Sequence, residues 1–261
     1  MTSQDSPAPA DPPVQPSSSP APQAPTAGPG VAIPMAVLGL ALLAGAAAWL
    51  VGESTLDSFH TSKAAENYQR PEILNQEMPR VSSLNGAVGF GPFGALLGLA
   101  MGLAGGLARR SLGGAVLGAV AGLILGTAAG VLPSFAVMPW HWAHRNDDPS
   151  STELMVPLMV HLCLWSGIGL AAGLAFGIGG SGFQPARLIE AAFVGLVGAV
   201  LGTFIFEIGG AFLFPLARTA SPFSVTPETR LLARLCVAGC VGLVALWALP
   251  PQPARQGTQP G

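Results

Sequence analysis

The sequence predicts an all-α protein, a polytopic bundle of about six transmembrane helices preceded by a disordered proline-rich tail. Charge is scarce, because Lys, Arg, Asp and Glu make up 9% of the 261 residues, against about a quarter in soluble domains. Half of the residues are hydrophobic and 35 are glycine. These values exclude an ordinary soluble enzyme domain. A net charge of −2 also argues against a nucleic-acid partner.

The first 30 residues form a separate region in which proline alternates with Ala, Ser and Gln. Such a segment buries too little apolar surface to offset its ordering entropy, so we expect it to be disordered. It is interpreted as a spacer, with a ligand for proline-recognition modules as the alternative. It contains no Lys or Arg, so it does not resemble the start of a signal peptide, and the run that follows is expected to be a retained anchor. The last residues, 250–261, are expected to be a second disordered tail.

Apolar runs long enough to cross a bilayer follow, since a helix needs about 20 residues to span the hydrocarbon core. Continuous runs of this length indicate helices, because barrel strands would alternate over about 10 residues. Most prolines lie where these helices are expected to end, and Pro92 is predicted either to kink the second helix or to start it. The predicted spans are Val31–Val51, Ala87–Ala108, Leu112–Leu132, Leu154–Ile178, Leu188–Phe214 and Leu231–Leu249, and the last five make up a membrane bundle over residues 85–249.

Residues 52–84 are predicted to form the one large extramembrane loop, which carries 8 of the 24 charged residues of the chain. About 33 residues are too few for an independent core. The loop is interpreted either as a solvated connector or as a docking surface. Arg109 and Arg110 occupy a very short turn, and short turns that carry Lys or Arg usually lie on the cytoplasmic side. This favours a cytoplasmic N-terminus. The expected location is the cytoplasmic membrane of a bacterium.

Glycines at four-residue spacing are the strongest pattern in the chain. Small residues at this spacing let two helix backbones approach closely and cross at an angle. Packing within the chain is the first interpretation, and homo-oligomer assembly or a thin-walled pore are the alternatives. The predicted packing residues are Gly94, Gly98, Gly102, Gly106, Gly114, Gly118, Gly122, Gly126, Gly130, Gly169, Gly173, Gly177, Gly198 and Gly202.

The same glycines suggest an internal repeat of a two-helix unit. The segment Gly98–Ala104 is similar to Gly169–Ala175, and Gly122–Thr127 is similar to Gly198–Thr203. Residues 87–132 and 154–214 would then be two parallel copies of one hairpin. Sequence of low complexity, rich in Gly, Ala and Leu, is the alternative explanation.

Ionisable residues inside the predicted spans are few, and each is a functional hypothesis because burying one in lipid costs about 2.5–3.5 kcal/mol. His161, near the start of its helix, and Glu207, near the end of the next, are expected at one depth, with Arg234 entering from the same face. We expect the three to form a polar intramembrane cluster able to relay protons or hold a cation. A structural hydrogen-bonded pair, with Arg234 reaching the headgroups, is the alternative.

The sequence contains no enzyme signature such as a P-loop, G-x-S-x-G or H-E-x-x-H. His141 and His144 have metal-capable spacing but lack further ligands, so neither a metal nor a cofactor is expected. The first hypothesis is a non-catalytic membrane component that binds itself or another membrane protein through the glycine-ladder helices and the 52–84 loop. The alternative is a small ion- or proton-coupled transporter or channel that uses Glu207 and His161. The lipid bilayer is the expected partner in either case.

Overall fold

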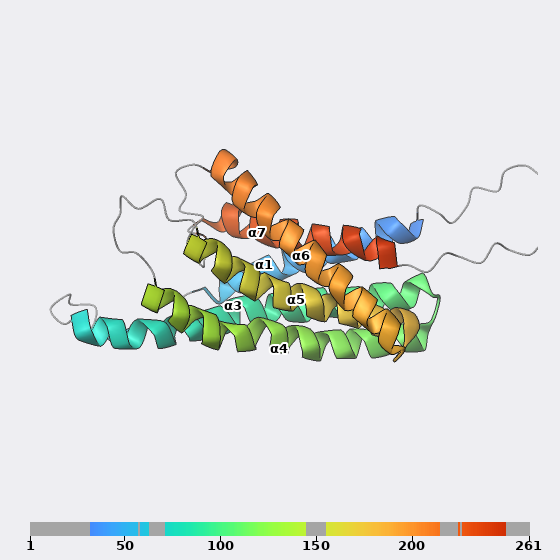
Figure 1. The fold of residues 1–261 in the computed structure, drawn as a ribbon, viewed down its shortest axis with the longest axis horizontal. Coiled ribbons are helices and arrows are strands. Elements are labelled where there is room, and N and C mark those ends of the chain that lie inside the picture. The colour runs from blue at the N-terminus through green and yellow to red at the C-terminus, as the bar shows by residue number, and fades with distance from the viewer. Residues whose placement is uncertain are drawn as a thin grey trace, which may run out of the picture.

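The computed structural model describes residues 32–56, 58–62, 71–144, 155–214, 224 and 226–248. Within this part the chain is all helical, with successive long helices running in opposite directions along the bundle (Figure 1). Both proposed disordered tails lie outside the described residues. The helices are α1 (Ala32–Ser54), α3 (Pro71–Ala108), α4 (Leu112–His144), α5 (Met155–Ser181), α6 (Pro185–Leu213) and α7 (Pro227–Ala245), followed by the 3-10 turn η1 (Leu246–Ala248).

Five of these helices are long and apolar enough to cross a membrane: α1, α3 from Asn75 onward, α4, α5 and α6. The expectation of about six spans is therefore reduced to five for the described residues. Helix α7 differs because it has only 19 residues and carries Glu228, Arg230 and Arg234 in its first half. Its position in the bundle is set by packing on α1 and α6.

Two helices are longer than their apolar runs predict. Residues 71–84, expected to belong to a loop, form the first turns of α3, and α4 continues through Pro133 to His144. Pro92 lies inside α3 and does not start it. A proline removes one intrahelical hydrogen bond, but neighbouring helices can support the interruption. Proline position is therefore a weak predictor of where these helices end.

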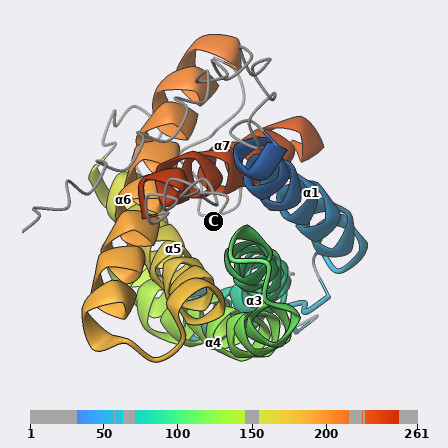
Figure 2. The ribbon, with the colours of Figure 1, turned by 90° about the vertical axis from the view of Figure 1, so that its right-hand side faces the viewer.

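The helices pack as a closed sequence of neighbours, α1–α3–α5–α6–α7–α1, and α4 covers the outer side of α3 and α5 (Figure 2). One hydrophobic core fills the space between them and draws on all six helices. Phe93, Leu97, Met101, Leu164 and Phe206 are among its fully buried side chains. The interior is thus a packed core of the kind that close-packed proteins have.

Glycines bring α3 and α4 into backbone contact. A Cβ atom placed on Gly98 would lie 2.2 Å from the carbonyl oxygen of Gly122, and one on Gly102 would lie 2.0 Å from that of Gly118. The pair Gly94 and Gly126 is equally close, at 2.0 Å. No side chain fits at these positions, so the two backbones themselves form the contact.

The second hairpin uses its glycines differently. On α5, Gly169 faces Gly195 and Ala199 of α6, as the repeat would suggest for a paired hairpin. Gly198 and Gly202 instead face α7, where added Cβ atoms would lie 2.7 and 2.6 Å from Val241 Cα and Val237 Cα. The sequence similarity with Gly122 and Gly126 is therefore not matched by equivalent contacts: Gly122 and Gly126 face α3, the helix before their own, whereas Gly198 and Gly202 face α7, the helix after their own.

Helix α4 has its small residues inside and its large ones outside. Its buried positions are mostly small residues in steps of three or four along the helix, and only 28% of its most apolar stretch is buried. Val116, Val120 and Ile124 on the opposite face are more than half exposed. These side chains face whatever surrounds the bundle, which in a membrane is lipid or another protein.

Candidate functional site

Two groups of polar side chains that join different helices lie at one end of the bundle. This end contains the last turn of α1, the beginnings of α5 and α7, and the last turns of α6. Two separate arrangements of side chains lie there: a pair between α5 and α6, and a cluster between α1, α3 and α7.

The first arrangement pairs His161 of α5 with Glu207 of α6. The Nδ1–H of His161 donates to Oε1 of Glu207. The imidazole is 1% exposed, whereas Glu207 is 18% exposed. His161 also stacks on Trp165 with ring centroids 4.7 Å apart, and Phe206 meets its edge at 5.9 Å.

The surroundings of this pair determine what it can do. Trp165 and Phe206 cover the imidazole, so Glu207 is its polar neighbour on the side that remains partly open. A carboxylate acceptor fixes which ring nitrogen of the histidine carries the hydrogen that faces it. The pair is therefore a buried hydrogen bond that orders two helices, and it holds an imidazole against a partly open carboxylate.

Arg234 does not join this pair, contrary to expectation. Its Nη2 donates to the carbonyl oxygen of Gly89 on α3, at 3.4 Å, and lies beside Gly52 of α1. The face of α7 explains the difference. Positions 234 and 238 face α1, where Gly45 makes room for them, whereas Val237 and Val241 face α6.

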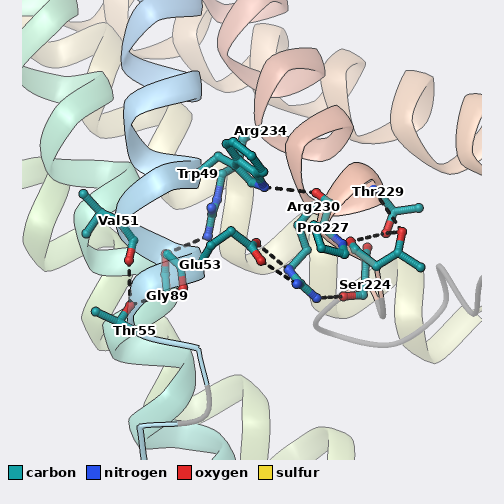
Figure 3. Close-up of polar contacts among 12 residues, drawn as sticks. Trp49, Val51, Glu53, Thr55, Gly89, Ser224, Pro227, Thr229, Arg230 and Arg234 are labelled. Atoms are coloured by element: carbon teal, nitrogen blue, oxygen red, sulfur yellow. Dashed lines mark hydrogen bonds and ion pairs between the residues drawn. The ribbon is translucent and has the colours of Figure 1, made fainter.

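The second arrangement is centred on an ion pair that the sequence reasoning missed. Glu53 accepts from Arg230 through both carboxylate oxygens, at 2.7 Å from Nε and 2.6 Å from Nη2 (Figure 3). Arg230 also donates to the carbonyl oxygen of Ser224 at 2.8 Å. The indole Nε1 of Trp49 donates to the carbonyl oxygen of Pro227 at 3.0 Å, which ties the same two helices together.

A signal for this pair exists in the sequence. Glu53 follows directly after an apolar run and Arg230 directly precedes another, so both lie at helix ends. Their pairing depends on α1 and α7 being neighbours at the same end, which spacing along the chain does not reveal.

A cavity of about 290 Å³ opens beside this cluster, and both Arg230 and Arg234 line it. Residues 58–62 form part of its wall. Asn85 of α3 accepts from the backbone N–H of Phe59 and donates to its carbonyl oxygen, both at 3.0 Å. Glu77 accepts from the backbone N–H and the hydroxyl of Ser62, at 2.7 and 2.8 Å.

Other polar residues of the helices have local partners. Arg187 pairs with Glu190 at 2.9 Å, as the three-residue spacing predicts. Thr127 and Thr203 donate to carbonyl oxygens four residues earlier, at 2.6 and 2.8 Å, as hydroxyl side chains inside helices commonly do. His144 likewise donates to the carbonyl oxygen of Trp140 on its own helix, at 2.8 Å.

No protein-family model, curated protein or solved structure matches this chain. The class is therefore defined by the fold itself: a helical bundle whose described part contains five apolar helices compatible with a membrane-embedded protein.

Proposed function

We propose that the protein is a non-catalytic component of a membrane, in a bacterium the cytoplasmic one, that assembles with itself or with another membrane protein. The outward face of α4 supports this proposal most directly. Its glycines face α3 and α5, and its large apolar side chains point away from the bundle. Helix association in lipid depends on packing between side chains and backbones, and this face offers side chains that no described helix covers.

The sequence predicts that the glycine-ladder helices bind the partner, and in this proposal the glycines instead support the helix that does. Their members on α3 and α4 contact each other within one chain, so they make α4 a rigid wall and are not themselves the surface that meets a partner. The part of the 52–84 segment that projects with α3 is the second proposed contact. Asn75, Gln76 and Arg80 are exposed there.

Site-specific photo-crosslinking in native membranes tests the assembly role. A photoreactive residue at Ile124, which is 62% exposed on α4, is expected to give protein–protein adducts. The matched control is Leu43, which is 68% exposed on α1 and is expected to give lipid adducts. Mass spectrometry of the adducts identifies the partner, and size measurement in mild detergent gives the stoichiometry. Lipid adducts alone at both positions, with a monomeric mass, would contradict the proposal.

A second candidate function rests on the His161–Glu207 contact. An imidazole that is 1% exposed and held against a partly open carboxylate is an arrangement that proton-coupled transporters use. In this alternative the protein moves a proton or ion, and Glu207 is the group that exchanges with the outside.

Flux measurements in proteoliposomes separate the two functions. A transporter predicts proton- or ion-dependent flux that Glu207→Gln abolishes. Glu190→Gln is the matched control, because Glu190 is 46% exposed and pairs locally with Arg187, so flux is expected to persist. Equal flux in both variants, or none in the unmodified protein, argues against this candidate.

A further inference from the structure

The cavity between α1, α3 and α7 has an arginine with too few partners. Arg234 makes one long hydrogen bond, 3.4 Å from Nη2 to Gly89 O, and its buried Nη1 has no hydrogen-bond partner. A buried donor without an acceptor is costly, and a charged one more so.

The charge balance at the cavity is positive. Arg230 and Arg234 both line it, and no Asp or Glu is among the described lining residues. Among the described residues, Glu53 is the acid that acts on Arg234, and both of its oxygens already accept from Arg230 at 2.6–2.7 Å. One guanidinium charge is therefore left without a bound carboxylate in this part of the structure.

The position of the cavity suggests where a compensating anion comes from. Gly52 and Thr55 line it at the point where the apolar run of α1 ends, and Trp49 lies one turn earlier. Tryptophan at a helix end is typical of the headgroup level of a bilayer. The other lining residues are mixed, with Leu56, Phe59 and Met78 beside Thr61 and Asn85.

We propose that this cavity binds a phosphate group, and that Arg234 is the residue that holds it. A guanidinium presents two N–H groups in a fixed fork that fits phosphate oxygens. The volume, about 290 Å³, is at the small end of ligand pockets and suits a headgroup phosphate or a small phosphate ester. An anionic phospholipid and free phosphate supply the same chemistry. The proposal depends on the membrane location of the bundle and is independent of the assembly role.

Thermal stability of the purified protein in detergent tests the site with three probes: phosphatidylglycerol in mixed micelles, phosphatidylcholine in the same micelles, and inorganic phosphate. Phosphatidylglycerol is expected to raise the Tm by several degrees, and Arg234→Gln is expected to weaken its apparent affinity at least tenfold. Arg234→Lys should retain part of the effect, because it keeps the charge. Arg187→Gln at the other end of the bundle is the control and should behave as the unmodified chain.

The probes also separate the two sources of phosphate. An effect of phosphatidylglycerol without an effect of inorganic phosphate identifies a lipid headgroup, and an effect of inorganic phosphate alone identifies a free anion. Equal shifts in the unmodified chain and in Arg234→Gln, or no shift with any probe, overturn the proposal.

A second measurement uses only the unmodified protein, in case Arg234→Gln fails to fold. Photoreactive phosphatidylglycerol is expected to label peptides that contain residues 52–62 or 78–89, which surround the cavity. Competition by excess inorganic phosphate is the corresponding test for a free anion. If there is neither labelling of these peptides nor protection by phosphate, the proposal is wrong.

Discussion

At the residue scale, His161 contributes more to the fold than its polar character suggests. Its ring is part of the core and touches Trp165 and Phe206, while one nitrogen binds Glu207. Packing and hydrogen bonding therefore act through the same side chain, and substitutions can separate the two contributions.

We predict that His161→Ala destabilises the protein by about 3 kcal/mol, because it leaves a cavity between two aromatic rings. Glu207→Gln should cost less than about 1 kcal/mol, because the amide oxygen still accepts from the imidazole. Denaturation of the purified variants in mixed micelles measures both. Equal losses would mean that the carboxylate charge, and not ring packing, dominates this site.

The Glu53–Arg230 pair gives a second prediction at this scale. Both side chains are mostly buried, with 22% and 10% exposure, so removing one partner strands the other charge. Arg230→Met alone is expected to cost about 3 kcal/mol. The double change Glu53→Leu and Arg230→Met should cost less than the single one.

A double-mutant cycle on the free energy of unfolding measures how strongly Glu53 and Arg230 interact. Arg187→Met is the control, because Arg187 belongs to an exposed ion pair, and its loss is expected to change the free energy by less than about 1 kcal/mol. Additive losses for Glu53 and Arg230 would show that the two side chains act independently.

At the scale of the elements, the sequence predicts correctly those contacts that form within one helix or between two helices joined by a short connection. His161 and Glu207 are brought to one depth by the short connection between α5 and α6, and this could be predicted from the helix rise alone. Back-bonding by Thr127 and Thr203 is equally local.

The features that could not be predicted depend on helices far apart in the chain. The direction of Arg234 depends on which face of α7 meets α1, and the Glu53–Arg230 pair joins residues separated by 177 positions. The early start of α3 was missed for another reason. Residues 71–84 are largely polar, and an apolar run indicates the part of a helix that contacts lipid and not the full length of the helix.

Backbone contact between α3 and α4 predicts a sharp difference between glycines. An added Cβ on Gly122 would lie 2.0 Å from Gly98 O and 2.9 Å from Ala175 Cβ. Because backbone cannot move aside as a flexible side chain does, Gly122→Ala is expected to cost at least about 2 kcal/mol. Gly39→Ala is the matched control, since nothing lies within 4 Å of its added Cβ, and it should be neutral or up to about 1 kcal/mol stabilising.

Thermal unfolding of the two alanine variants measures the difference. If Gly122→Ala were as stable as Gly39→Ala, α3 and α4 would have to be further apart than the structure places them.

At the scale of the whole molecule, the two longest helices, α3 and α4, are longer than a bilayer is thick. Helix α3 has 38 residues, which is about 57 Å at the usual helical rise, against a hydrocarbon core of about 30 Å. One end of the α3–α4 hairpin therefore extends beyond the lipid, and Figure 1 shows the beginning of α3 projecting past the other helices.

This length predicts where water-soluble reagents reach the chain. In a protein whose three cysteines are replaced by alanine, Gln76→Cys and Arg110→Cys are expected to react with a charged maleimide from opposite sides of the membrane. Ile124→Cys, exposed in the middle of α4, should not react, because a charged reagent does not reach the depth of the hydrocarbon core. Reagent added to intact cells should label Gln76→Cys if the N-terminus is cytoplasmic. Labelling of both ends from one side would contradict a single crossing by α3.

Helix α4 has small residues on its buried face and large apolar residues on its exposed face, and this arrangement has a consequence for the evolution of the sequence. Mutations among the outward Val, Leu and Ile residues exchange one hydrocarbon side chain for another and leave the packing inside the bundle unchanged, so the sequence of this face can vary. The inward glycines touch backbone and admit no larger residue. Distant relatives would therefore have low overall sequence identity but would retain small residues at four-residue spacing along α4. This spacing would identify them as relatives where sequence identity does not.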